Sequence, residues 1–155
     1  MPHEIIRSVG DGQIGNLATP INASDWVLKY LKNLPAYRPD LSAFRRGLEV
    51  GMAHGYWLLG PFITLGPFRD TGLGNVSALL STCFLVLIAS MAIWLYGQSN
   101  PRPPLASLPT APPPIELSTG DGWCRYAGGF LLGGIGGTLF AYVVLVLVSL
   151  YGFFF

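Results

Sequence analysis

Two long apolar segments without a charged residue constrain this chain more than any other feature of its sequence. One runs from about Asn75 to Tyr96 and the other from about Tyr126 to Leu150. A helix needs about 20 mostly apolar residues to cross the hydrocarbon core of a bilayer, and both segments have that length. Only 11% of the residues are charged, whereas soluble domains average about a quarter. The sequence therefore predicts an all-α membrane protein.

A third, weaker transmembrane helix is expected ahead of these two, from about Gly47 to Leu65. It contains Glu49, His54 and a Gly-Pro pair, so hydropathy alone does not identify it. With this segment, the chain divides into an N-terminal arm, residues 1–44, and a three-helix membrane domain, residues 45–155.

The arm and the last loop each carry a local signal. Residues from Ser24 to Leu34 predict a short amphipathic helix, capped by Ser24. This helix suits either a membrane surface or a face packed on another protein. Seven prolines between positions 97 and 122 predict an extended, water-exposed loop between the second and third spans.

Basic residues orient the expected spans. Six of the nine Lys and Arg lie in the first 46 residues, before the first span, and only Arg69 lies in the following loop. Arg102 and Arg125 lie between the second and third spans. Because cytoplasmic segments carry an excess of Lys and Arg, the N-terminus and the 97–122 loop are expected on the cytoplasmic or stromal side, and the C-terminus on the opposite side. The net charge of +1 predicts no nucleic-acid binding.

The sequence contains no motif for catalysis. Cys83 and Cys124 lack CxxC or CxxCH spacing and are expected to be packing residues. We find no nucleophile–base set, no Gly-rich phosphate loop after a strand and no cysteine set for an iron–sulfur cluster. We therefore expect a protein that is not an enzyme.

His54 is the strongest candidate ligand. A helical rise of about 1.5 Å per residue places it about 12 Å beyond Arg46, inside the hydrocarbon. A polar group is costly there, so the imidazole needs either a hydrogen bond to a neighbouring helix or a metal. Zinc needs about four clustered ligands, and His54 has no companion at ligand spacing. A lone histidine instead suits haem iron or chlorophyll magnesium, and the lack of a second buried histidine favours chlorophyll.

Glu49 and a set of glycines share this segment. Glu49 lies about 140° round the helix from His54, so the two cannot jointly grip one small ion. Its carboxylate either pairs with Arg45, one turn earlier, or ligates magnesium, which prefers oxygen. Small residues also recur at every fourth position in two segments: Gly47, Gly51 and Gly55 in the first, and Gly129, Gly133, Gly137 and Ala141 in the last. Either stripe suits close helix packing, and the first also suits a flat ring against the backbone.

Three stretches of sequence are the most specific in the chain: Asn33-Leu-Pro-Ala-Tyr-Arg38, Arg46-Gly-Leu-Glu-Val-Gly-Met-Ala-His-Gly55 and Leu65-Gly-Pro-Phe-Arg-Asp70. Together they resemble the signature of the photosystem I subunit XI (PsaL) family, of cyanobacterial type. The resemblance covers the whole architecture, from the stromal arm to the Gly-rich third span.

This resemblance implies an accessory photosystem I subunit in the thylakoid membrane, with a stromal N-terminus and a lumenal C-terminus. It implies that His54 and Glu49 ligate the magnesium of chlorophyll a, beside carotenoid (β-carotene). It also implies that Asp70 and Pro67 belong to a calcium site where monomers meet in a trimer. The expected partners are the large core subunits, the small membrane subunits and lipid.

Two alternatives have their own motives. A haem-binding membrane anchor of an oxidoreductase would use His54, but would need a second axial ligand. A small transporter would use a helix break at Gly60-Pro61, although no internal repeat supports it.

Overall fold

The computed structural model describes residues 6–8, 17–102 and 114–152. Residues 103–113 of the proline-rich loop expected over 97–122 and the C-terminal Phe residues lie outside these residues.

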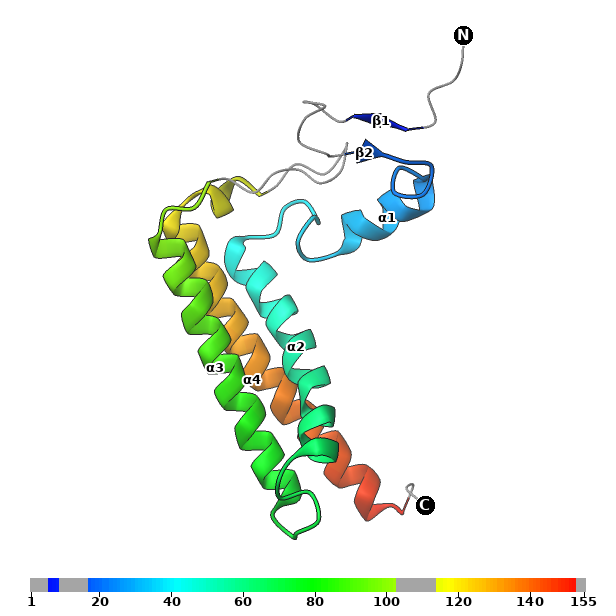
Figure 1. The fold of residues 1–155 in the computed structure, drawn as a ribbon, viewed down its shortest axis with the longest axis vertical. Coiled ribbons are helices and arrows are strands. Elements are labelled where there is room, and N and C mark those ends of the chain that lie inside the picture. Colours follow the sequence, from blue (N-terminus) through cyan, green and yellow to red (C-terminus); the bar gives the residue numbers. More distant parts are fainter. Residues whose placement is uncertain (1–5, 9–16, 103–113, 153–155) are drawn as a thin grey trace.

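Most of the described chain is helical (Figure 1). The helices are α1 (Asp25–Asn33), α2 (Ala43–Leu65), α3 (Gly74–Gln98), the short 3-10 helix η1 (Ile115–Ser118) and α4 (Gly120–Leu150). The N-terminal arm also contains a two-residue antiparallel ladder, β1 (Arg7–Ser8) with β2 (Leu17–Ala18), which the sequence pattern did not predict.

Two of the bundle helices begin earlier than their expected spans because polar side chains cap them. Ser42 Oγ accepts a hydrogen bond from the Arg45 backbone N–H at 3.3 Å, so α2 begins at Ala43. Thr119 Oγ1 accepts one from the Gly122 N–H at 3.1 Å, so α4 begins at Gly120. Such caps lie outside the apolar window that defines a span, so hydropathy starts these segments too late.

Two of the described helices, α3 and α4, are long and apolar enough to cross a membrane. With 23 residues, α2 is about 34 Å long, which also matches the bilayer core. Its hydropathy is lower because it includes Arg45, Arg46 and Glu49. Apolarity therefore supports two of the three expected spans, whereas the support for α2 is its length.

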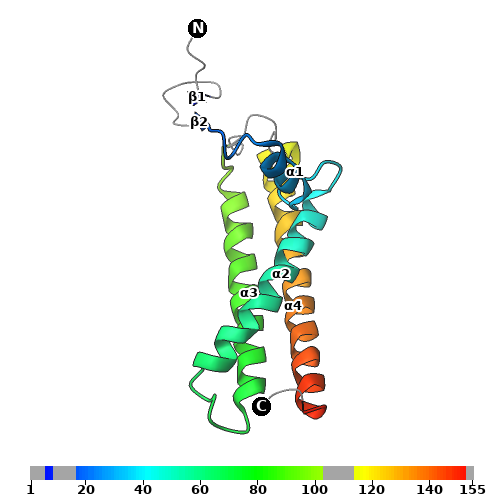
Figure 2. The same ribbon diagram turned by 90° about the vertical axis from the view of Figure 1, so that its right-hand side faces the viewer.

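The three long helices form an elongated bundle (Figures 1 and 2). α2 runs down the bundle, α3 returns antiparallel to it, and α4 runs parallel to α2 and contacts both. α1 lies outside the bundle, near the end where α2 begins. Ser24 caps α1 by accepting a hydrogen bond from the Val27 N–H, and no residue of α1 is buried.

Facing glycine stripes build the contact between α2 and α4. A Cβ on Gly51 would lie 2.2 Å from the Phe130 carbonyl oxygen, and one on Gly133 would lie 2.0 Å from that of Leu48. Gly47, Gly55, Gly129 and Gly137 approach the opposite backbone equally closely. Only residues without a side chain allow this approach. The structure thus decides between the two interpretations of the first stripe: it serves helix packing.

The interior of the bundle is tightly packed, and its buried hydroxyls bond within their own helices. Val86 is almost fully buried, and its Cγ1 would lie 2.4 Å from a Cβ on Gly134. Thr82 and Thr138 are fully buried, and each hydroxyl donates to a backbone carbonyl one turn earlier at 2.8 Å. These bonds satisfy the hydroxyls without a partner on another helix.

α2 continues through Pro61 to Leu65. The helix break expected at Gly60-Pro61 is therefore not seen, and the transporter alternative loses its motive.

Candidate functional site

α2 carries both candidate ligands, and they lie on different sides of its contact with α4. His54 contacts Phe130 of α4, with ring centroids 5.4 Å apart and planes inclined by 56°. Glu49 lines a groove on the other side of the glycine stripe, together with Met52 and Tyr56. The two residues therefore face separate surroundings, as their helical spacing predicts.

The His54 ring is exposed and is held by its own helix. Its Nδ1 lies 2.7 Å from the carbonyl oxygen of Val50, one turn earlier. A carbonyl oxygen can only accept, so Nδ1 carries the proton and donates it to Val50. In the neutral ring, Nε2 then keeps its lone pair, which is the state in which imidazole binds a metal.

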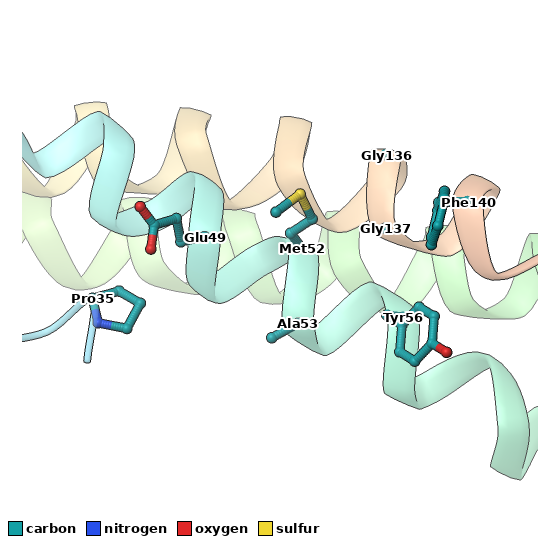
Figure 3. Close-up of a pocket in the computed structure, with 8 residues that line it drawn as sticks. All are labelled: Pro35, Glu49, Met52, Ala53, Tyr56, Gly136, Gly137 and Phe140. Atoms are coloured by element: carbon teal, nitrogen blue, oxygen red, sulfur yellow. The ribbon is translucent and has the colours of Figure 1, made fainter. Parts of the chain in front are cut away.

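The groove beside Glu49 is a long, mostly apolar hollow of about 880 Å³. Its walls come from α2, α4 and the loop before α2: Pro35, Glu49, Met52, Ala53, Tyr56, Gly136, Gly137 and Phe140 (Figure 3). Figure 3 shows the Glu49 carboxylate and Pro35 at one end, and Tyr56 with Phe140 at the other. Pockets that bind small organic ligands typically have a volume of about 300–1,000 Å³ and are lined by apolar groups with a few polar ones.

Glu49 forms an ion pair with Arg38, from the loop between α1 and α2. Both side chains are about one-third exposed. The ion pair with Arg45, one of the two alternatives for Glu49, is therefore not the pair that forms. An acidic residue that follows a basic one by four positions is the less favourable order on a helix, and the loop brings Arg38 to the carboxylate instead.

Arg46, a buried residue of α2, also binds the loop between α1 and α2. Its side chain is buried, and Nη1 donates to the Pro35 carbonyl at 2.7 Å. The buried guanidinium stays charged and lies near the Glu116 carboxylate. Glu116 itself accepts a hydrogen bond from the Ala43 N–H at the start of α2.

Asp70 and Pro67 share the turn between α2 and α3, at the other end of the bundle. The Asp70 side chain is 83% exposed, and its carboxylate lies 3.5 Å from Arg69 Nε. Among the described residues, no group of three or more His, Cys, Asp or Glu is placed to hold a metal ion. Calcium usually takes six to eight oxygen ligands, so this turn alone does not make a calcium site.

The sequence analysis did not identify two residues that contact Glu49 or the start of α2. Arg38 is 11 residues from Glu49, and Glu116 is 73 residues from Ala43. Only the first left a signal, because Arg38 closes one of the three specific stretches.

Two helices of the bundle are apolar and of membrane length, and a third carries the candidate ligand side chains. This arrangement is typical of a small helical membrane protein. The family model for photosystem I reaction centre subunit XI matches residues 4–150. The chain belongs to this family.

Individual relatives agree with the family match. Subunit XI of Mastigocladus laminosus is 52% identical over 85% of this chain and 76% of its own length. That of a Nostoc species is 51% identical over 90% of this chain and 81% of its own. That of Crocosphaera subtropica is 50% identical over 91% of this chain and 90% of its own length.

Family membership defines the protein as a structural subunit of photosystem I, associated with its other subunits in the thylakoid membrane, and not an enzyme. The haem-anchor alternative has no support among these relatives.

Proposed function

We propose that this subunit holds chlorophyll a through His54 and Glu49, binds carotenoid along its apolar surface, and provides a surface through which photosystem I complexes associate. Bound chlorophyll would absorb light and pass the excitation on; the chain itself would fix where the pigment lies and how it is oriented.

The observation that carries this proposal is the hydrogen bond from His54 Nδ1 to the Val50 carbonyl. It fixes both the tautomer and the ring orientation, as the outer partners of metal-bound histidines commonly do. Because the ring is exposed rather than packed inside the bundle, a macrocycle can reach Nε2. An imidazole in lipid without such a ligand would be costly.

Glu49 supports a second ligand position. Its carboxylate lies at one end of an apolar groove large enough for an organic ligand, and magnesium accepts a carboxylate oxygen. For carotenoid, the support is the apolar outer surface of the bundle, where Phe84, Ile88 and Leu95 of α3 are more than half exposed.

We also propose that α2 crosses the membrane, giving three spans behind the stromal arm of residues 1–44. Its length and its continuous packing along α4 support this arrangement. The bias of basic residues supports a stromal N-terminus and a lumenal C-terminus.

For association, we propose that Asp70 and the Pro67 segment contribute to a calcium site completed by water or by a neighbouring complex. The exposure of Asp70 supports access from outside, while its pairing with Arg69 is the competing arrangement.

Replacing His54 with Leu tests the pigment assignment. We expect purified complexes that keep the subunit to lose the chlorophyll held by His54, seen as a lower chlorophyll-to-subunit ratio and a changed red absorption band. Thr64→Val is the matched control, because Thr64 is also an exposed polar residue of α2 bonded to its own helix, at 3.2 Å from Gly60 O. An unchanged pigment ratio and spectrum in His54→Leu would refute the assignment.

A further inference from the structure

We propose that Arg38 is a positioning residue for Glu49: its ion pair holds the carboxylate at the end of the groove with one oxygen left for a ligand. The inference rests on the proposed ligand role of Glu49.

The contact uses one oxygen of the carboxylate. Arg38 Nη2 binds Glu49 Oε1. Within the described part of the chain, no hydrogen bond to Oε2 is found. Glu49 is therefore oriented through one oxygen and keeps the other, while its side chain lines the groove.

The loop that carries Arg38 is itself anchored. The Tyr37 and Arg38 N–H groups donate to the Leu34 carbonyl at 3.0 and 2.8 Å, which closes a turn after α1. Arg46, buried in the first turns of α2, donates to the carbonyl of Pro35. Pro35 also lines the groove. The same turn thus closes one end of the groove and presents the guanidinium to Glu49 there.

A positioned guanidinium suits this task physically. A carboxylate at an apolar groove is costly unless a cation accompanies it, and a charge-assisted bond restricts the rotation of a flexible Glu side chain. Outer partners of this kind change the affinity of a metal ligand by about 10- to 100-fold when they are removed. Arg45 does not replace Arg38, since its side chain is exposed and forms no ion pair within the described residues.

The test compares four variants in purified photosystem I complexes: Arg38→Gln, Arg38→Lys, Glu49→Leu and the control Arg45→Gln, which removes one positive charge near the same helix end. The readouts are pigment-to-subunit ratio, the absorption and circular dichroism spectra in the red band, and subunit content on a gel.

We expect Glu49→Leu and Arg38→Gln to change the same spectral feature. In Arg38→Gln, the affinity of the site for chlorophyll should fall by about 10- to 100-fold. Arg38→Lys should keep the pigment with a shifted band, because the charge remains but the planar fork is lost. Arg45→Gln should match the wild type.

The two proposals fail differently. If Glu49→Leu changes nothing, Glu49 is not a ligand and both ideas fall. If Glu49→Leu loses pigment while Arg38→Gln keeps both ratio and spectrum, only the role of Arg38 is overturned. If Arg38→Gln prevents incorporation of the subunit, Arg38→Lys decides: an unshifted spectrum at full subunit content overturns the inference.

Discussion

At the scale of single residues, backbone contacts decide what the polar and small side chains of α2 can do. His54 Nδ1 is satisfied within its own helix, by the carbonyl oxygen of Val50, and not by a group on α3 or α4. Its other nitrogen is then free for chemistry outside the bundle. A hydrogen bond to a neighbouring helix, the competing expectation for a membrane histidine, would have used that capacity for packing.

Substitution of Gly51 tests the glycine contact. We expect Gly51→Ala to destabilise the α2–α4 pair by about 1–3 kcal/mol, because the added Cβ would overlap the Phe130 carbonyl oxygen and force the helices apart. Release of the subunit from heated complexes, followed on a gel, measures the effect as a lower release temperature.

Gly60→Ala is the matched control on the same helix, because a Cβ there meets nothing within 4 Å. Equal release temperatures for Gly51→Ala and the wild type would contradict the close packing of the two backbones.

At the scale of the elements, α2 combines the length of a membrane span with charged residues at one end. It has the length of a membrane span and packs on α4 along its glycine stripe, yet it carries charged residues in its first turns. These charges gather at the end beside the loop before α2, where Arg38, Arg46 and Glu116 hold the chain together. The polar end therefore belongs to the stromal boundary in the proposed topology, and the glycine-lined part to the membrane.

Protease accessibility tests that topology. In stroma-side-out membranes, a protease of broad specificity should cut the 97–122 loop without opening the vesicles, because the proposed topology, based on the bias of basic residues, has this loop on the stromal side. The turn at Arg69 provides the internal control: trypsin should reach this exposed residue only after the lumenal side is opened. Cleavage with the reverse pattern would invert the orientation, and cleavage of both from one side would contradict a membrane-crossing α3, which separates Arg69 from the loop.

At the scale of the whole molecule, the bundle is too slender to cover its own apolar surface. Large side chains such as Trp57 and Phe84 are 75% and 62% exposed. Lipid, pigment or other subunits must cover such surface, which fits a chain that works as part of photosystem I. The two ends differ: one carries the arm and the arginine contacts, and the other a short exposed turn.

Association of complexes through that turn gives the last prediction. If Asp70 contributes to a calcium link, Asp70→Ala and a calcium chelator should each convert larger assemblies to smaller ones, measured by gel filtration of solubilised complexes. If Asp70 only pairs with Arg69, the contribution of such an exposed pair is about 0–1 kcal/mol and the assembly size should not change.

Asp121→Ala is the control, since Asp121 forms a comparable exposed pair with Arg125 near the opposite end of the bundle. If neither the chelator nor Asp70→Ala changes the assembly size, Asp70 is only a surface charge.

Much of the helical character could be predicted because its causes are local. Apolar runs around Val86 and Val144 indicate helices of membrane length, and Ser24 marks the start of α1 by its own hydrogen bond. The family could also be predicted, because a ten-residue block such as 46–55 is specific in itself. The candidate ligands His54 and Glu49 belong to that block, and their ligand roles stay predictions.

The sequence by itself determined which segments become the long helices, and it supplied His54 and Glu49 as candidate ligands, since caps, apolarity and residue chemistry act over a few neighbouring positions. Only the tertiary structure decided that the glycines of α2 face the backbone of α4, that Glu49 pairs with Arg38 rather than Arg45, and that Glu116 reaches the start of α2. These contacts join residues far apart in the chain. They depend on how the helices and the loop before α2 pack: the glycine stripes indicate close packing, but the partner helix and the partners of the charged side chains follow from the tertiary structure alone.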